Sequence, residues 1–211
     1  MHLAEPMTLI TDFVLALLGL WFGWRLWHQG RDWDPRRWWA TAFWAMALAA
    51  LLGGSAHGFA PMLNGSSQAL IWRATMVALG AAAVLLVYAS IRTLGGQVLW
   101  AGLLGAEFGL YAVWVSWFDS DFFYAVLEYG TALLVVLVIH LGLMARRRPG
   151  AGAVVVGVGI SFLAAWIQQA EISPSAVFNH NDLYHVVQMA GLFFLYRGAA
   201  RVTATKPVEP T

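Results

Sequence analysis

The sequence predicts an all-α, polytopic membrane protein: a bundle of seven transmembrane helices with its N-terminus outside and its C-terminus in the cytoplasm. Hydrophobic residues make up 60% of the 211 residues and charged residues only 11%, whereas a soluble domain is about one quarter charged. The apolar residues form continuous runs of about 20 residues, the length that crosses a bilayer as a helix. The cations lie beside every second connection between these runs, and this pattern sets the orientation.

Seven apolar runs, each ended by turn residues or charges, define the predicted spans. They cover residues 8–27, 38–59, 69–91, 98–118, 122–145, 151–170 and 182–199. A β-barrel is excluded because its strands would alternate apolar and polar residues. We expect one seven-helix domain over residues 1–200 and a disordered cytoplasmic tail over residues 201–211, which is polar and contains proline.

The distribution of Lys and Arg orients the chain. All twelve except Arg73 fall on one side if the chain crosses seven times, and the opposite connections carry acidic residues such as Asp119 and Glu171. Cytoplasmic connections carry the excess of Lys and Arg in membrane proteins, so the N-terminus is expected outside. The abundance of Arg, Ala, Gly and Trp is typical of a GC-rich bacterium, and we expect a multi-pass protein of a bacterial inner membrane.

Composition also restricts the classes of function. The net charge of +1 gives no basis for nucleic-acid binding, so membrane lipid, including a lipid-like substrate, is the expected partner. Cysteine is absent, which excludes disulfides, thiolate metal sites and a cysteine nucleophile. The single lysine, Lys206, lies in the tail, and this excludes a retinal Schiff base. No feature of the sequence specifies the oligomeric state.

Polar residues of six spans converge on the outer half of the predicted bundle. Ionisable groups inside a membrane are costly, so each is a functional candidate. Depth follows from the topology at about 1.5 Å of rise per residue. The outer group comprises Asp12, His57, Arg73, Glu128, Gln168, Gln169, Glu171, His180, Asp182 and His185. A polar cavity that opens outward would account for this distribution.

The start of the seventh span, Asn-His-Asn-Asp-Leu-Tyr-His, predicts a metal site. Asn181 and His185 are spaced i, i+4 and Asp182 and His185 i, i+3, so either pair shares a helix face. His57 lies at the same depth on another span. Zinc accepts imidazole nitrogen and carboxylate oxygen, and three protein ligands plus water form a catalytic site. We expect zinc at His57 and His185, with Asp182 or His180 as third ligand.

Two alternatives to zinc remain open at this point. The histidines can be hydrogen-bonded bundle residues, with the Asn and Asp side chains acting only as helix caps. In the other alternative, haem is the cofactor: His57 and His185 near the outer face, and His28 and His140 near the inner face, would form two bis-His sites of a membrane electron carrier.

Together, these features resemble a known superfamily. Seven spans, an outward N-terminus, His57 closing the second span and a polar face opening the seventh resemble the alkaline ceramidases and the progestin and adipoQ receptors. The Asn-His-Asn-Asp-Leu-Tyr-His stretch, followed by Leu-Tyr-Arg-Gly, also resembles an uncharacterised bacterial membrane family associated with that superfamily. The resemblance implies a zinc ion held by His57 and His185, and hydrolysis of the amide bond of a ceramide-like lipid.

Several positions depart from the superfamily pattern. The first ligand of the seventh helix falls on Asn181, so Asp182 or His180 would have to replace it. The superfamily serine of the second helix falls on Gly53, with Ser55 nearby at a different spacing. No Asp follows the second span, which reads Ser-Ser-Gln at residues 66–68.

The resulting hypothesis is a zinc-dependent intramembrane hydrolase that acts on a lipid amide in an outward-facing cavity. The metal would activate a water molecule and polarise the acyl carbonyl. Glu128 or Asp12 would accept the proton, with Ser55 as a further catalytic candidate. The competing class is a non-enzymatic membrane protein, such as a transporter, receptor or assembly subunit, and the missing Ser and Asp favour it.

Overall fold

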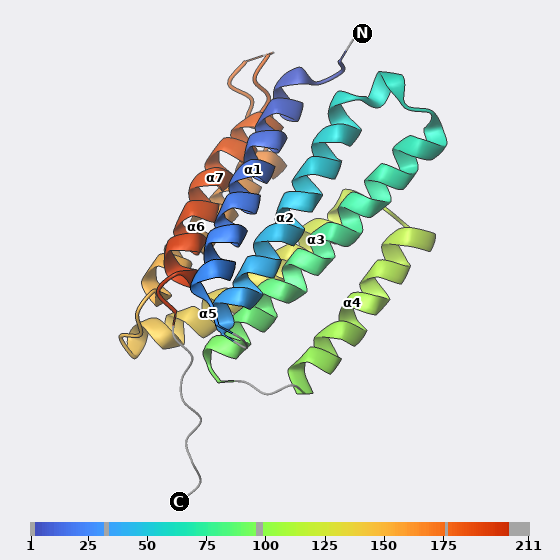
Figure 1. Ribbon diagram of the computed structural model, residues 1–211. Helices are drawn as coiled ribbons and strands as arrows, with labels where there is room; N and C mark the ends of the chain where they lie inside the picture. Colours follow the sequence, from blue (N-terminus) through green and yellow to red (C-terminus); the bar gives the residue numbers. More distant parts are fainter. Residues whose placement is uncertain (1–2, 32–33, 96–98, 176, 203–211) are drawn as a thin grey trace, which may run out of the picture.

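The computed structural model describes residues 3–31, 34–95, 99–175 and 177–202. Its regular elements in these ranges are seven long helices and one short 3-10 helix, η1 (Ala60–Met62). The long helices are α1 (Pro6–Gln29), α2 (Pro35–Gly58), α3 (Gly65–Thr93), α4 (Leu99–Trp117), α5 (Phe122–Ala145), α6 (Ala151–Gln169) and α7 (His180–Ala199). Figure 1 shows them side by side along one axis, and α1 begins at the opposite end from the end of α7.

The seven-helix membrane bundle predicted from the sequence is confirmed. Among the described residues, α1 to α6 are each long and apolar enough to cross a membrane. α7 is more polar because its first turns carry side chains such as His180, Asp182 and His185. It nevertheless has 20 residues, which at 1.5 Å per residue reaches about 30 Å, the thickness of the hydrocarbon core. The chain is therefore a multi-pass helical membrane protein.

Short polar side chains begin several of these helices. Asp34, Asn64 and Asp121 each accept a hydrogen bond from a backbone N–H in the first turn of α2, α3 and α5, respectively. α7 begins with a capping box, in which Asn179 accepts N–H groups of the first turn and Asp182 accepts the N–H of Asn179. Such caps satisfy backbone donors that have no partner within the helix.

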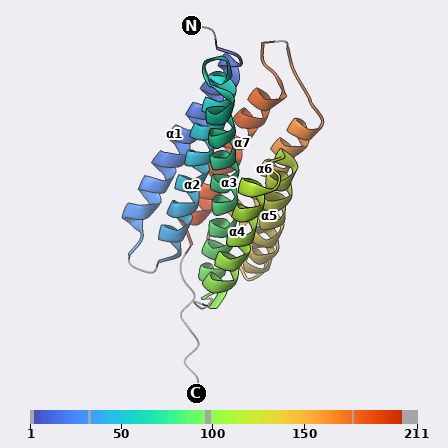
Figure 2. The ribbon, with the colours of Figure 1, turned by 90° about the vertical axis from the view of Figure 1, so that its right-hand side faces the viewer.

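Six of the helices form a closed ring. α1 packs against α2, α2 against α3, α3 against α5, α5 against α6, α6 against α7, and α7 returns to α1. α4 lies outside this ring and packs mainly against α3 (Figures 1 and 2). Of the described residues of α4, Val115 alone is buried. The Tyr111 ring takes the space that a side chain at Gly80 would fill, and so fixes α4 on α3.

Small residues bring neighbouring helices of the ring into close contact. A Cβ added at Gly54 of α2 would lie 2.7 Å from the Cβ of Asp12 on α1. A Cβ added at Gly157 of α6 would lie 2.8 Å from the backbone nitrogen of Leu195 on α7. Helices in membranes associate through such close backbone approach. Gly159, by contrast, has open space around it and does not serve this packing.

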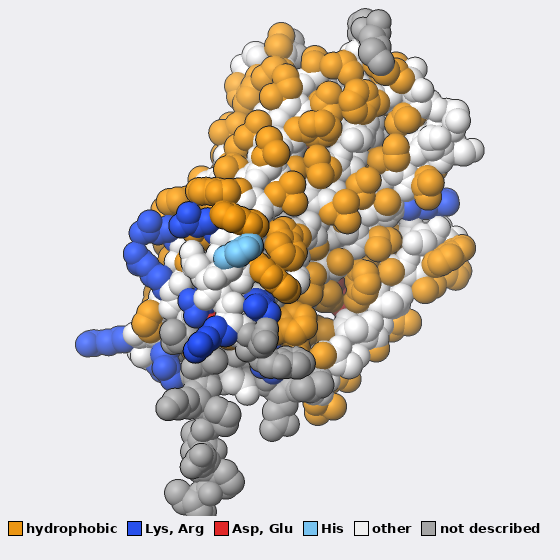
Figure 3. Space-filling view, in the orientation of Figure 1, with side chains coloured by type: hydrophobic (Ala, Val, Ile, Leu, Met, Phe, Trp, Pro, Cys, Tyr) orange, Lys and Arg blue, Asp and Glu red, His pale blue; other side chains and the backbone are white. Residues whose placement is uncertain are grey.

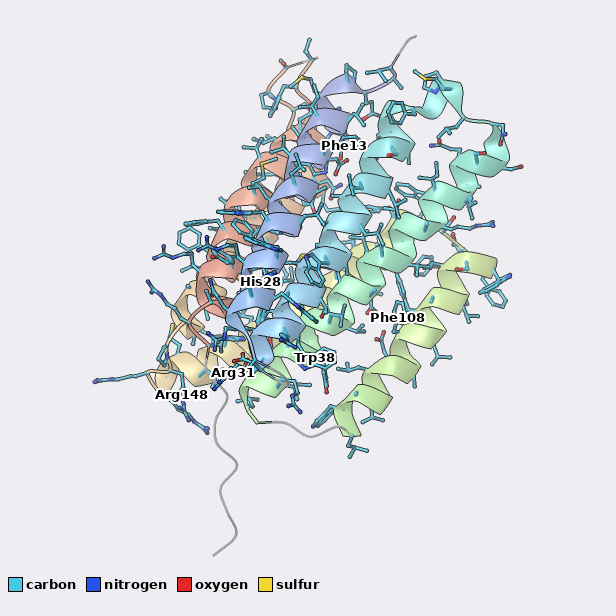
Figure 4. All side chains as sticks on the ribbon, in the orientation of Figure 1. Phe13, His28, Arg31, Trp38, Phe108 and Arg148 are labelled. Carbon is cyan, nitrogen blue, oxygen red and sulfur yellow. The ribbon has the colours of Figure 1, made fainter. Side chains whose placement is uncertain are left out.

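The charged and apolar surfaces separate along the bundle axis. In Figure 3, hydrophobic side chains cover the sides of the bundle, and most Lys and Arg side chains on this face gather at the end where α1 and α7 finish. His28, Arg31 and Arg148 lie toward that end in Figure 4, whereas Phe13 lies toward the other. Residues 203–211 of the predicted tail lie outside the described residues, and Val202 packs into the core.

Candidate functional site

The ring encloses a cavity of about 230 Å³. All six ring helices line it, and α4 does not. Its polar lining residues are Asp12, His57, Trp72, Thr75, Tyr129, Ser161, Gln168, Asn181, Tyr184, His185 and Gln188. These residues lie toward the starts of α1, α3, α5 and α7 and the ends of α2 and α6, which is the predicted outer half. The same six spans were predicted to contribute polar groups there.

The central polar feature of the cavity is a pair formed by Asp12 of α1 and His185 of α7. The Oδ1 atom of Asp12 lies 3.1 Å from Nε2 of His185. On the other side of the ring, Nδ1 lies 3.0 Å from the Thr11 hydroxyl. Asp12 and His185 are only 5% and 8% exposed. Both ring nitrogens therefore have a partner from α1, and the imidazole is held in one orientation.

This geometry places a proton between the two side chains. A carboxylate oxygen and an unprotonated imidazole nitrogen are both acceptors, so a contact of 3.1 Å needs one proton on one of the two atoms. The second oxygen of Asp12, Oδ2, has no hydrogen-bond partner in the part of the chain that the structure describes. Because Asp12 lines the cavity, this oxygen is available to a bound molecule.

A second polar group joins the outer ends of three helices. Nδ1 of His57 lies 3.4 Å from Oε1 of Glu5, and the Thr8 hydroxyl lies 3.1 Å from Oε2 of the same carboxylate. Thr8 also lies 3.0 Å from Oδ1 of Asp182 on α7. The His57 side chain is 32% exposed and lines the cavity, so it lies at the outer entrance.

Asp182 and His180, predicted as alternative third zinc ligands, serve the start of α7 instead. Asp182 is fully buried. Its Oδ2 accepts the Asn179 N–H at 2.7 Å, and its Oδ1 accepts a hydrogen bond from the Thr8 hydroxyl. His180 contacts the Ser173 hydroxyl in the connection from α6. Neither residue lines the cavity. Among the described residues, no group of three or more His, Asp or Glu side chains is arranged to hold a metal.

The other predicted catalytic residues lie apart from this site. Glu128 is half-buried on α5, within hydrogen-bonding reach of Glu107 on α4, and does not line the cavity. The Ser55 hydroxyl donates to the Leu51 carbonyl of its own helix at 2.7 Å, and Ser55 does not line the cavity either. Asp12 is the one predicted proton acceptor that the fold brings to His185.

The two inner histidines occupy different environments. His28 is exposed on α1, where Nδ1 contacts the Trp24 carbonyl at 2.9 Å (Figure 4). His140 is fully buried on α5, with Nε2 at 3.3 Å from the Ser90 hydroxyl and its ring against Trp39. The haem alternative thus gains no support from the inner pair.

The partners of His185 on α1 were not identified from the sequence. Thr11 and Asp12 follow Thr8 at i+3 and i+4, so both lie beside Thr8 in a polar stripe on α1. That stripe was the available signal, and only Asp12 was selected from it. Deeper in the ring, Gln188 donates to the Ser161 hydroxyl at 3.2 Å and connects α7 to α6.

The chain belongs to a family of unknown function, DUF6962, which matches residues 7–204. The match therefore covers all seven helices. No curated protein and no solved structure matches the chain. The family description assigns no activity.

Proposed function

We propose that this protein binds an amphiphilic molecule of the membrane in the cavity, with the polar end of that molecule at the Asp12–His185 pair. The observation that carries the proposal is the pair itself, buried in the wall of a cavity whose surface is mostly apolar. The apolar lining residues include Leu15, Met46, Leu79, Leu133, Phe162 and Leu192. Apolar walls with a few convergent polar groups are typical of small-molecule sites.

The cost of the pair supports a functional role. Ionisable side chains inside a membrane are expensive and usually mark binding sites or pathways. Packing alone would be served by apolar residues at both positions. Because the pair lines the cavity, a ligand can contact it and offset part of the free energy spent on burying it. The cavity of about 230 Å³ is smaller than most drug-sized sites, so we expect it to take a headgroup and part of one chain.

A zinc-dependent hydrolase is the second candidate, and one observation favours it. Asp12, His57 and His185 have donor atoms that zinc accepts, and all three line the same cavity. Zinc, when bound, would act as a Lewis acid and activate water for attack on a lipid amide. Asp12 and His185 would then bind zinc instead of contacting each other. In either role, we place the protein in a bacterial inner membrane.

Photolabelling tests the binding function. The probe is a monoacylglycerol with a diazirine in its chain, added to protein in zwitterionic nanodiscs. Label is expected on the cavity residues of α5 and α7, and an excess of unlabelled monoacylglycerol should remove it. Gly53 lines the cavity, and a Cβ there would meet only Thr75, at 3.5 Å. Gly53→Leu therefore fills the cavity and should reduce labelling at least about tenfold.

Gly159→Leu is the matched control, because a side chain at Gly159 points into open space outside the ring. This variant should label like the wild type. Equal labelling of the wild type and Gly53→Leu, or label confined to α4, would show that the probe binds only to the lipid-facing surface. The proposal would then be wrong.

A further inference from the structure

We propose that the polar end of the bound molecule is cationic: the cavity takes a single-chain amine and disfavours a phosphate. This inference rests on the proposed binding function and specifies its ligand class. Its basis is the charge around the cavity. Asp12 lies within electrostatic reach of Asp182 and Glu5, and none of the described residues that line the cavity is Lys or Arg. Carboxylates attract a cation and repel an anion at such distances.

The hydrogen-bonding capacity of Asp12 also suits an ammonium group. Oδ1 is occupied by His185, whereas Oδ2 has no partner among the described residues although the side chain is only 7% exposed. Oδ2 is not one of the fully buried side-chain atoms that lack a partner, so a bound molecule can reach it. An ammonium group carries three donors and no acceptor, so it satisfies this oxygen. A phosphate carries acceptors, and it would meet a second acceptor here.

Aromatic residues at the same end provide additional attraction for a cation. Trp72 of α3, Phe122 of α5 and Tyr184 of α7 line the cavity. The faces of aromatic rings attract ammonium groups, and the attraction is larger where water is excluded. The anionic side chains and the aromatic rings thus both favour a positively charged headgroup. A neutral alcohol can use the hydrogen bonds but gains nothing from the charges.

The experiment compares three probes with the same hydrocarbon chain: hexadecylamine, hexadecanol and hexadecyl phosphate. Each competes with the diazirine monoacylglycerol for wild-type protein in zwitterionic nanodiscs. The amine should compete at a concentration at least about tenfold lower than the alcohol, because charge-assisted hydrogen bonds are about twice as strong as neutral ones. The phosphate should be the weakest of the three.

Two variants test whether the preference for the amine depends on the charge of Asp12. Asp12→Asn removes the charge and should bring the amine to the level of the alcohol. Glu107→Gln removes a carboxyl of α4, outside the ring, and should leave the order unchanged. If Asp12→Asn does not fold, Glu5→Gln tests the same charge from the entrance and should reduce the amine preference in part.

The outcomes separate the ligand class from the binding function. If the alcohol competes as well as the amine, or the phosphate competes best, the cationic assignment is wrong and binding stands. If none of the three competes in wild-type protein, both are wrong. An amine preference that survives Asp12→Asn and Glu5→Gln would also overturn the assignment, because the charge that causes it would then lie elsewhere.

Discussion

Breaking the contact between Asp12 and His185 should destabilise the bundle by more than an ordinary hydrogen bond between membrane helices. Hydrogen bonds between transmembrane helices average about 0.6 kcal/mol in double-mutant cycles. A hydrogen bond to a charged group contributes about 1.5–3 kcal/mol. The atoms lie 3.1 Å apart and both residues are buried, so we expect a coupling free energy in the higher range.

The assay is a double-mutant cycle of Asp12→Ala, His185→Ala and the double variant. The free energy of unfolding in bicelles is measured by adding SDS and following helical circular dichroism. Thr11→Val provides the comparison, since it removes the contact at Nδ1 of the same ring without removing a charge. If Asp12→Ala and His185→Ala add to within about 0.5 kcal/mol, the pair has no special coupling and the argument for a functional site at this position fails.

Three further predictions address orientation, metal and pH. Reporter fusions after residues 61, 120 and 173 should report the outside, and fusions after residues 29, 96 and 148 the cytoplasm; an outside signal at residue 148 would reverse the orientation. If zinc is bound, elemental analysis should give about one ion per chain in colourless protein, with near-complete loss in His57→Ala and His185→Ala but retention at saturating zinc in Asp182→Ala. Visible absorption that changes on reduction would instead indicate haem. Burial alone would raise the pKa of Asp34, but its hydrogen bonds with Arg36 outweigh burial and hold that pKa below its usual 3.8. The wild type should therefore be more stable than Asp34→Asn near neutral pH, and the difference in unfolding free energy should disappear as the pH falls through the lowered pKa; a constant difference would refute this cause.

The spans could be predicted from the sequence because each is a continuous apolar run with a polar end. The sixth helix ends at Gln169, one residue from the predicted end. The seventh begins at His180 rather than residue 182, because the capping box starts at Asn179. The observed helix ends differ from the predicted ones where a side chain caps the backbone. Asn and Asp can serve as caps or as metal ligands, so residue type alone does not separate the two roles.

The position of α4 could not be predicted. Its mean hydropathy is close to that of α2, which belongs to the ring, so composition does not distinguish a ring helix from a peripheral one. Helix packing depends on contacts between residues far apart in the chain. Glu107 lies on α4, the long helix that packs outside the ring in the described part of the chain.

The sequence predicted only part of the cavity lining. Of the ten residues expected to converge on the outer half, Asp12, His57, Gln168 and His185 line the cavity, whereas Arg73 and Glu128, expected from the third and fifth spans, do not. The partner of His185 was sought within its own helix, where spacing is informative. Asp182 has the right spacing, but its two oxygens accept the Asn179 N–H at the start of α7 and the Thr8 hydroxyl of α1. Asp12, from a helix 173 residues earlier in the chain, takes the position instead.

Two adjacent glycines of α2 allow packing and site geometry to be tested with the smallest possible change. A Cβ at Gly54 would lie 2.7 Å from the Cβ of Asp12 and 3.3 Å from its Oδ2. Gly54→Ala should therefore displace Asp12, at an overpacking cost of about 1–3 kcal/mol, and reduce probe labelling as well as the free energy of unfolding.

Gly53→Ala is the matched control, because its Cβ would lie in ordinary contact with Thr75 at 3.5 Å. Alanine also favours a helix over glycine by about 0.5–1 kcal/mol, so this variant should be as stable as the wild type or more stable. For both variants, the free energy of unfolding is measured in SDS, and binding is measured by labelling with the diazirine monoacylglycerol. Equal stabilities for the two variants would show that α1 and α2 do not approach at Gly54, and the position of Asp12 in the cavity would lose its structural basis.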